Sequence, residues 1–388
     1  MRTIVISNDV VPGFGVPVAA PGLRAAGLAE GLRAHGHDVH VAVPADLMSQ
    51  LFGDHVPAAP PHTDVVAPAS LNDFISEFRA DVVVFINANL TPHLDPNANV
   101  HYVYDLFAPK LLELQASGLA TSVDVENLTA MKVRALAMAD SVWVNGSRKR
   151  PYATEWLNRP DVATARARLS RAERPRDHMA IVEMPVPLPA GVTPKQSSPL
   201  KSDTTPIRVG IAGYAQRWSA LDTVHFGHEL LVSRGIELHV LLPGHWGGGT
   251  EPPRNALPYG AITHDGPLEF STFSTWVQSM DAMVDVFAPS PERSLAMITR
   301  SAVALRLGVP LIHAVDSEVT DIVNELNAGW ILAPDDLDGW RRVCDELVQP
   351  DLLAEKGRGA VRSSLERFAP REAVRTAATR LKTSLEVS

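Results

Sequence analysis

The chain has 388 residues, of which 45% are hydrophobic and 20% are charged, and its formal net charge is −9. This length exceeds what one hydrophobic core usually serves, so two domains are expected. The acidic balance disfavours a nucleic-acid-binding protein, because phosphate neutralisation needs an excess of Lys and Arg. The single cysteine, Cys344, excludes an intramolecular disulfide and fits a cytoplasmic protein.

The first half of the chain alternates short apolar runs with helical patterns. Runs that are apolar at nearly every position are typical of parallel strands covered by helices on both faces. No basic segment precedes a long apolar core, and no apolar run reaches the roughly 18 residues of a membrane span, so we expect neither a signal peptide nor a transmembrane helix. The predicted strands are Thr3–Ser7, His37–Pro44, Asp81–Asn87, Asn99–Leu106 and Asp140–Ser147, with a helix over 21–35.

A stretch rich in Pro, Ser and Thr over 186–206 predicts a linker, because proline interrupts helices. The alternation then restarts, which predicts one domain over 1–185 and another over 207–369. A terminal helix over 370–388 follows, and its return to the first domain is one arrangement open to it. The strands predicted in the second domain are Ile207–Gly213, Ile236–Gly244, Asp281–Ser290 and Val309–Val315, with a helix over 221–234.

Five stretches in chain order resemble one family. They are APGLRAAGLAEGLRAHGHDVHVAVP, YDLFAPKLLEL, SVWVNGSRKRPYATEWL, IVEMPVPLP and PERSLAMITRSAVALRLGVPLI. Together they resemble the GT-B glycosyltransferases, specifically the retaining type that uses nucleotide sugars. Within that type they are similar to the subgroup of glycosyltransferase family 4 that carries a "GPGIR" amino-terminal motif. The resemblance spans almost the whole chain.

This resemblance implies an α/β fold in which two doubly wound, Rossmann-like domains face each other across a cleft. It implies an enzyme that moves a sugar from a nucleotide-diphosphate sugar to a hydroxyl acceptor with retention of configuration. The leaving diphosphate would help to deprotonate the acceptor, so that no dedicated base and no metal would be required. The first domain would take the acceptor, which could be a glycan, a lipid-linked sugar or a natural product, and the second would take the donor nucleotide.

The amino-terminal loop is a candidate anion site. Gly13, Gly15 and Gly22 permit close backbone approach, and a helix begins near Gly22, where unpaired N–H groups favour an anion. In the resembling family this loop faces the donor diphosphate, and Arg24 would add a fixed cation. The alternative is a tight turn followed by a surface arginine.

A second phosphate-binding loop is expected after the strand Ile207–Gly213. Gly213 allows the loop to pack closely, and Arg217 is the available cation, although a solvated loop arginine is the alternative. The GHWGGG stretch over 244–249 lacks the spacing of a dinucleotide-binding loop and is interpreted as flexible.

The stretch that begins PERSLAMITRS carries the donor site that the resemblance implies. Glu292 and Arg300 stand at the family's spacing, with Thr299 beside the arginine. Three residues after this arginine the relatives carry a carboxylate, but this chain has Val303. A carboxylate accepts hydrogen bonds from a ribose diol and valine accepts none, so the ribose end of the site is expected to be incomplete. An ion pair at a helix start is the alternative role for Glu292 and Arg300.

Asp105 stands at the carboxyl end of a predicted strand, where ligands bind in doubly wound sheets, so it is a candidate for contact with the acceptor or the sugar. It could equally cap the next helix. None of four histidines has a metal-ligand pattern with a third partner, and packed or surface positions are expected for them. These are His101, His225, His228 and His313.

Two locally basic stretches, over 148–157 and 166–176, have two interpretations. One is a solvated helix face, and the other is weak contact with anionic lipid on the inner face of a membrane. Two alternatives to a transferase also remain: a non-catalytic accessory subunit of the GT-B type whose ribose site has decayed at Val303, or an enzyme that uses the same cleft on a modified sugar.

Overall fold

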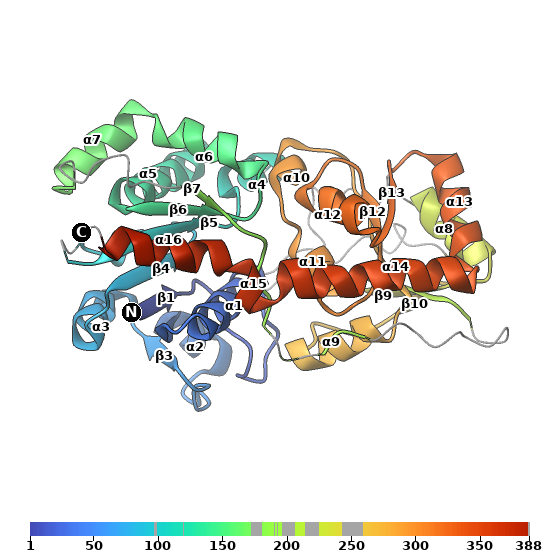
Figure 1. The fold of residues 1–388 in the computed structure, drawn as a ribbon, viewed down its shortest axis with the longest axis horizontal. Helices are drawn as coiled ribbons and strands as arrows, with labels where there is room; N and C mark the ends of the chain where they lie inside the picture. Colours follow the sequence, from blue (N-terminus) through green and yellow to red (C-terminus); the bar gives the residue numbers. More distant parts are fainter. Residues whose placement is uncertain are drawn as a thin grey trace. The chain divides into compact units, whose positions relative to one another are not determined.

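The computed structural model describes residues 1–96, 99–118, 120–171, 181–189, 191, 193–195, 206–213, 225–242 and 259–386. The chain forms two compact units (Figure 1). Unit 1 comprises Met1–Pro189 together with Ala369–Ser388, and unit 2 comprises Ala190–Phe368. The segment after unit 2 therefore returns to unit 1. No helix in the described ranges is both long enough and apolar enough to cross a membrane.

Unit 1 is built on a 7-stranded sheet with the order β3-β2-β1-β4-β5-β6-β7, and all of its neighbouring strands are parallel. The strands are β1 Arg2–Ile6, β2 Asp38–Pro44, β3 Thr63–Val66, β4 Val82–Ile86, β5 His101–Leu106, β6 Ser141–Val144 and β7 Ile181–Glu183. The helices are α1 Ala20–Ala34, α2 Ala45–Phe52, α3 Leu71–Phe78, α4 Lys110–Ala116, α5 Ser122–Met138, α6 Lys149–Leu157, α7 Pro160–Arg168, α15 Pro370–Ala373 and α16 Arg375–Glu386.

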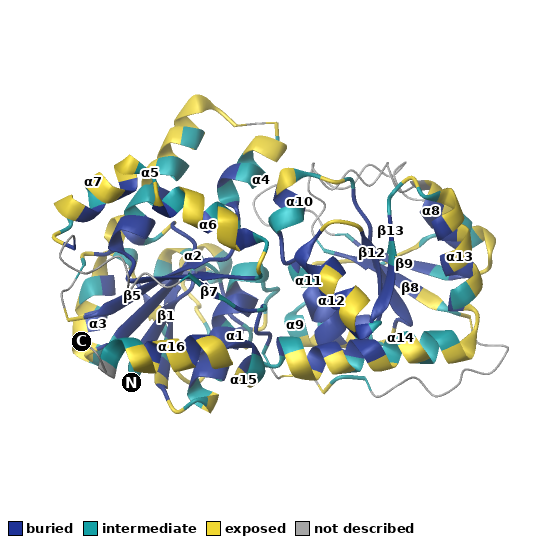
Figure 2. Cartoon of the chain, turned by 45° about the horizontal axis from the view of Figure 1, so that its top comes forward, coloured by how far each residue is buried: buried dark blue, intermediate teal, exposed yellow. Residues whose placement is uncertain are grey.

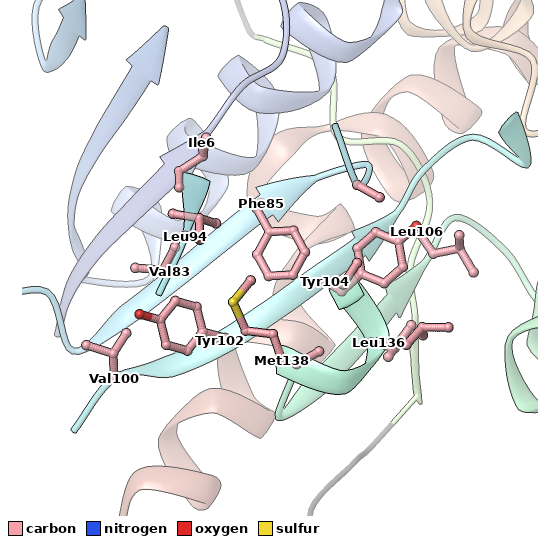
Figure 3. Close-up of a cluster of buried hydrophobic side chains, with 14 of the residues drawn as sticks. Ile6, Val83, Phe85, Leu94, Val100, Tyr102, Tyr104, Leu106, Leu136 and Met138 are labelled. Carbon is pink, nitrogen blue, oxygen red and sulfur yellow. The ribbon is translucent and has the colours of Figure 1, made fainter. Parts of the chain in front are cut away.

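The core of unit 1 follows from the alternation of side chains along its central strands. Val83 and Phe85 of β4 lie on the same face as Tyr102 and Tyr104 of β5, and apolar residues of α3, α5 and α6 pack against them (Figure 3). Both strands are buried along their whole length. This pattern is expected for central strands of a sheet covered on both faces.

Helix α1 packs closely against other backbone segments at its glycines. A Cβ on Gly22 would lie 1.7 Å from the carbonyl oxygen of Val10, in the loop that follows β1. A Cβ on Gly31 would lie 2.4 Å from the carbonyl oxygen of Pro370, which begins α15. Larger residues at these positions would push α1 away from the loop and from the returning carboxyl-terminal segment.

Unit 2 is built on a 6-stranded parallel sheet with the order β10-β9-β8-β11-β12-β13. Its central strands are largely buried and both residues of the edge strand β10 are exposed, whereas α13 and α14 present exposed residues on their outer faces (Figure 2). The strands are β8 Arg208–Ala212, β9 Glu237–Leu241, β10 Ile262–Thr263, β11 Ala282–Asp285, β12 Leu311–Ala314 and β13 Gly329–Leu332. The helices are α8 His225–Ser233, α9 Phe270–Gln278, α10 Pro291–Leu295, α11 Thr299–Arg306, α12 Glu318–Leu326, α13 Leu337–Leu347 and α14 Pro350–Ser363, which runs into a π-helical turn over Ser364–Phe368.

Every strand predicted from an apolar run is present, as is the doubly wound α/β architecture. Four strands were not predicted, namely β3, β7, β10 and β13. They lie at the margins of the sheets, and β3, β7 and β10 are only partly buried or exposed, so these three lack the continuous apolar run that indicated the central strands. β7 begins just before the predicted linker.

The prediction of a solvated basic face was wrong for three cations of the stretches over 148–157 and 166–176. Lys149, Arg166 and Arg171 are all buried. Arg166 Nη1 donates to the carbonyl oxygens of Ala137 and Ala139, 3.1 and 2.8 Å away. These carbonyls lie at the carboxyl end of α5, where helical acceptors lack internal partners, so the arginine caps that helix.

Candidate functional site

Unit 2 reverses its strand order at β8, whose neighbours in the sheet are β9 on one side and β11 on the other. In doubly wound sheets, ligands bind outside the carboxyl ends of the strands at such a switch point. Gly213 directly follows β8, and Asp285 is the last residue of β11. The expected donor-site residues of unit 2 therefore lie beside the position that the topology favours for a ligand.

Arg300 is held across this switch point by three contacts. Its Nε donates to Asp285 Oδ1 at 2.8 Å, and its guanidinium carbon lies 4.2 Å from the centre of the Phe287 ring. A Cβ on Gly213, whose φ is +110°, would lie 3.1 Å from Arg300 Cδ. Within the described ranges the Nη2 atom of Arg300 has no hydrogen-bond partner. The guanidinium is thus fixed through Nε and the Phe287 ring, while its buried Nη2 donor makes no hydrogen bond within the described ranges.

Asp285 is a buried carboxylate that fixes Arg300. Burial opposes its ionisation, but the charges of Arg300 and its other neighbours outweigh burial and hold the pKa of Asp285 below its usual value. The Ser301 hydroxyl donates to its other oxygen. Burial lowers the pKa of the neighbouring His313 to about 4, so this imidazole is neutral at pH 7. Neither Asp285 nor Phe287 was identified from the sequence, although a carboxylate inside an apolar strand was a signal for the former.

A second guanidinium shares the Phe287 ring. Arg293 of α10 lies with its guanidinium carbon 4.6 Å from the ring centre, and its Nε is 3.5 Å from Glu292 Oε2. Both side chains are buried. Arginines stack on aromatic faces and also bind phosphate bidentately. Arg293, which was not predicted from the sequence, therefore lies with Arg300 and Glu292 at this position.

Helix α11 carries two further residues singled out from the sequence. Thr299 begins α11 immediately before Arg300, and Val303 lies in the same helix with only 2% of its surface exposed. Arg217 and the GHWGGG stretch lie outside the described residues. In the described part of the chain, no three His, Cys, Asp or Glu side chains are grouped so that they could hold a metal ion.

The burial of Val303 leads to a prediction. Replacing Val303 with Glu is expected to lower the free energy of unfolding by about 2–4 kcal/mol, because a buried carboxylate loses its hydration. Val303→Ala is the control, and it should cost about 1–2 kcal/mol through lost packing alone. Urea unfolding measures both values. A Val303→Glu protein that is as stable as the parent and binds nucleoside diphosphates more tightly would show instead that this position faces a ribose.

The two unit 1 candidates Arg24 and Asp105 bind each other. Arg24 Nε and Nη2 donate to the two carboxylate oxygens of Asp105 at 2.9 and 2.8 Å, and Nη1 donates to the Pro185 carbonyl at 2.9 Å. Both side chains are 0% exposed. The structure therefore gives each of them a buried internal partner, and their expected roles toward a diphosphate and an acceptor stay predictions. Because they lie 81 positions apart, no local pattern indicated this pairing.

The glycines of the amino-terminal loop differ in what they allow. Gly15 has φ +75° and is exposed, and a Cβ there would meet nothing within 4 Å, so close approach of a ligand remains open at this residue. Gly22, by contrast, is buried against Val10. Its absent side chain is explained by packing of α1 on its own loop.

Asp9, in the same loop, has a strongly shifted pKa and was not predicted from the sequence. Burial raises the pKa of Asp9 to about 6, and the opposing effects of the Val10 amide and the Lys110 charge are smaller. Val10 N donates to its Oδ1 at 2.7 Å. The folded state therefore binds this proton more tightly than the unfolded state does.

Protonated Asp9 therefore adds to the free energy of unfolding. This stabilisation is complete below about pH 3.8 and is lost as the pH rises through about 6. Asp9→Asn, which keeps an acceptor for Val10 N, should be more stable than the parent at pH 8 by roughly 2–3 kcal/mol and nearly equal to it below pH 4. Urea unfolding across this pH range tests the expectation. Asp161→Asn is the control, because hydrogen bonding to Arg159 lowers the pKa of Asp161, so this variant should be less stable than the parent at pH 8. A loss of stability at pH 8 in both variants would contradict the raised pKa of Asp9.

Each unit has a parallel sheet whose strand order reverses once, at β1 in unit 1 and at β8 in unit 2. Two such sheets in one chain define the GT-B class of fold, as predicted. Solved structures share it over the whole chain. The sucrose-phosphate synthase of Thermosynechococcus elongatus is 12% identical, with a TM-score of 0.70 and 100% of both chains covered. The Anabaena protein HepE in complex with UDP is 13% identical, with a TM-score of 0.60 and 99% of this chain and 100% of that chain covered. WaaG, a glycosyltransferase involved in lipopolysaccharide biosynthesis, is 12% identical, with a TM-score of 0.56 and 100% of both chains covered.

No protein-family model matches the sequence, and no curated protein sequence matches it. At these identities the likeness establishes the fold alone.

Proposed function

We propose that the protein is a glycosyltransferase that takes a nucleotide-diphosphate sugar as donor and a hydroxyl compound as acceptor. The observation that carries this proposal is the pair of guanidiniums, Arg293 and Arg300, on the Phe287 ring at the switch point of unit 2. Two cations beside a nucleotide-binding position suit a diphosphate, whose negative charge grows as the sugar leaves. The GT-B fold, shared with HepE in complex with UDP, supports the same assignment.

The chemistry would be transfer with retention of configuration. The bond between the anomeric carbon and the diphosphate oxygen breaks, and a bond from the same carbon to the acceptor oxygen forms on the same face. The acceptor proton passes to the departing diphosphate, so no side chain need act as a base. Arg300 and Arg293 would stabilise the diphosphate, and Glu292, next to them, would contact the donor sugar. With these cations in place, no metal would be needed, and the anomeric configuration of the product, read by NMR, tests retention.

The first experiment is a calorimetric titration of the full chain with UDP, GDP, dTDP, ADP and CMP, in EDTA and then in Mg²⁺. Selective binding of one diphosphate in EDTA supports the proposal and identifies the donor nucleotide. A ligand near a hundred times its dissociation constant should also stabilise the fold by about 2.7 kcal/mol, which thermal unfolding would detect. Binding that requires Mg²⁺ would overturn the metal-independent part only.

One observation favours a second candidate, a non-catalytic accessory subunit of the GT-B type. Val303 occupies the position at which the resembling family carries a ribose-binding carboxylate, and its side chain is buried. If a folded sample binds none of the nucleotides, the accessory role is the better account.

A further inference from the structure

Two buried side chains face each other at the carboxyl ends of β11 and β12 in unit 2. Asp285 and His313 are register partners on these neighbouring strands, so their side chains leave the sheet on the same face. His313 Nδ1 lies 3.7 Å from Asp285 Oδ2, and the His313 side chain is 0% exposed. The other oxygen of Asp285 binds Arg300 Nε. The imidazole is therefore connected to the guanidinium of the candidate donor site through one carboxylate.

The other ring nitrogen of His313 faces the start of α12. His313 Nε2 and Ser317 Oγ are 2.8 Å apart. Ser317 is the N-cap of this helix, because its Oγ accepts from Thr320 N at 3.2 Å and its own N–H donates to Thr320 Oγ1 at 3.0 Å. Thr320 Oγ1 in turn donates to the carbonyl of Ala314, the last residue of β12, at 2.9 Å. This reciprocal capping box fixes the first turn of α12 and the position of the Ser317 hydroxyl.

The charge of Asp285 determines which ring nitrogen of His313 carries the hydrogen. The imidazole is neutral at pH 7, because burial lowers its pKa to about 4, so only one nitrogen is protonated. Burial raises the pKa of Asp285, but the charges of Arg300 and its neighbours outweigh burial, so Asp285 is ionised. The Ser301 hydroxyl, which is 3.5 Å from His313 Nδ1, already donates its hydrogen to Asp285. A lone pair on Nδ1 would be repelled by the carboxylate, so Nδ1 carries the hydrogen and Nε2 accepts from Ser317 Oγ.

A chain of polar contacts thus runs from Arg300 through Asp285 and His313 to Ser317, and it connects four elements, α11, β11, β12 and α12. We propose that His313 is a positioning residue of the donor site: as the Nδ1–H tautomer, it fixes Asp285, and through it Arg300, relative to the start of α12. The effect of His313 on the affinity for a diphosphate rests on the proposed function. Its tautomer and its effect on the Arg300–Asp285 contact do not, so they can be measured without a ligand.

Two substitutions of His313 separate the roles of its ring nitrogens. Asparagine places an amide near the position of Nδ1, so His313→Asn keeps a donor toward Asp285 but does not reach Ser317. Glutamine places its amide near the position of Nε2, so His313→Gln keeps a partner for Ser317 but removes the donor toward Asp285. His101→Gln is the matched control, because His101 is also buried and its Nε2 lies 2.9 Å from Ser141 Oγ, but in unit 1. Circular dichroism of the full chain verifies that each variant is folded.

The first measurement uses NMR at pH 7 on the full chain labelled with ¹⁵N-histidine or ¹⁵N-arginine. We expect His313, identified by the resonances lost in His313→Gln, to show a protonated Nδ1 and an unprotonated Nε2. A protonated Nε2 would overturn the inference, because no hydrogen would then point at Asp285. The Nε–H hydrogen of Arg300 should exchange with water about two- to tenfold faster in His313→Gln, which is the effect of one lost hydrogen bond. Its exchange should not change in His313→Asn or His101→Gln.

The second measurement is the calorimetric affinity of the same proteins for UDP, GDP, dTDP and ADP. The diphosphate that binds the parent should bind His313→Gln about two- to tenfold more weakly, and it should bind His313→Asn and His101→Gln as tightly as the parent. Equal losses in the two His313 variants would assign the effect to lost packing, and an undiminished affinity in His313→Gln would also overturn the inference. If the parent binds no diphosphate, the proposed function fails, whereas the tautomer and the Arg300 exchange rates still decide the role of His313.

Discussion

Removing either member of the Arg24–Asp105 pair is expected to destabilise unit 1 by about 3–5 kcal/mol, because the remaining charge is left buried without its partner. The pair is bidentate and completely excluded from solvent, and the third arginine donor is bound by Pro185. Arg24→Met and Asp105→Leu should each show this loss. The double variant should recover much of it, since it leaves no unpaired charge.

The chain offers a control with the same bidentate geometry at the surface. Arg159 binds Asp161 through Nε at 3.0 Å and Nη2 at 2.7 Å, but both side chains are more than 40% exposed. Truncating this pair should cost no more than about 1 kcal/mol, because water replaces the lost contact. Urea unfolding measures the loss in free energy of unfolding for each pair. Hydrogen exchange of the β4 and β5 amides reports the stability of unit 1 separately. Equal costs at the two sites would refute the burial argument.

The same double variant separates a structural role from a role in donor binding. If Arg24 and Asp105 only hold unit 1 together, the folded Arg24→Met/Asp105→Leu protein should bind a nucleoside diphosphate as tightly as the parent. A selective loss of affinity for the diphosphate would restore Arg24 as the phosphate ligand that the resemblance implies.

The second large effect is expected at Arg300. Replacing Arg300 with Ala should weaken the binding of the preferred nucleoside diphosphate by about ten- to a hundredfold, which corresponds to the loss of a charge-assisted hydrogen bond worth roughly 1.5–3 kcal/mol. Asp285→Asn should act in the same direction and more weakly, because it frees the guanidinium without removing it. Asp285 is in this sense a positioning residue.

The readout for this prediction compares two ligands. A nucleoside that lacks phosphates should bind the parent, Arg300→Ala and Asp285→Asn equally well, whereas the diphosphate should distinguish them. Arg341→Ala is the control, since Arg341 forms an exposed pair with Asp338 in the same unit. Equal losses for nucleoside and diphosphate would mean that the variants disturb the fold of unit 2, and undiminished affinity in Arg300→Ala would remove it from the donor site.

The fold was predictable because long parallel strands are apolar at nearly every position, as in β4 and β5. The site was predictable only in part. Arg300 and Glu292 were selected through their place in a motif and stay predictions, but Asp285, which binds Arg300, comes from a different element, 15 residues away. Such partners are set by the order of strands in the sheet, which local periodicity does not report.

The same limit explains the result at Arg24. An arginine in the first turns of a helix at the edge of a sheet resembles an anion site, and the sequence also marked Asp105 as polar at a strand end. Whether two such charges face a ligand or each other depends on β1, β4 and β5 lying side by side.

The return of Ala369–Ser388 to unit 1 has a consequence for biogenesis. Unit 2 is one continuous segment, so it can fold as soon as it leaves the ribosome. Unit 1 begins first, yet the backbone of Pro370 that contacts α1 at Gly31 is translated only after the whole of unit 2. During synthesis, unit 1 therefore stays incomplete until Ala369–Ser388 has been translated. Until then, the surface that this segment covers would be accessible to chaperones that bind exposed apolar surface.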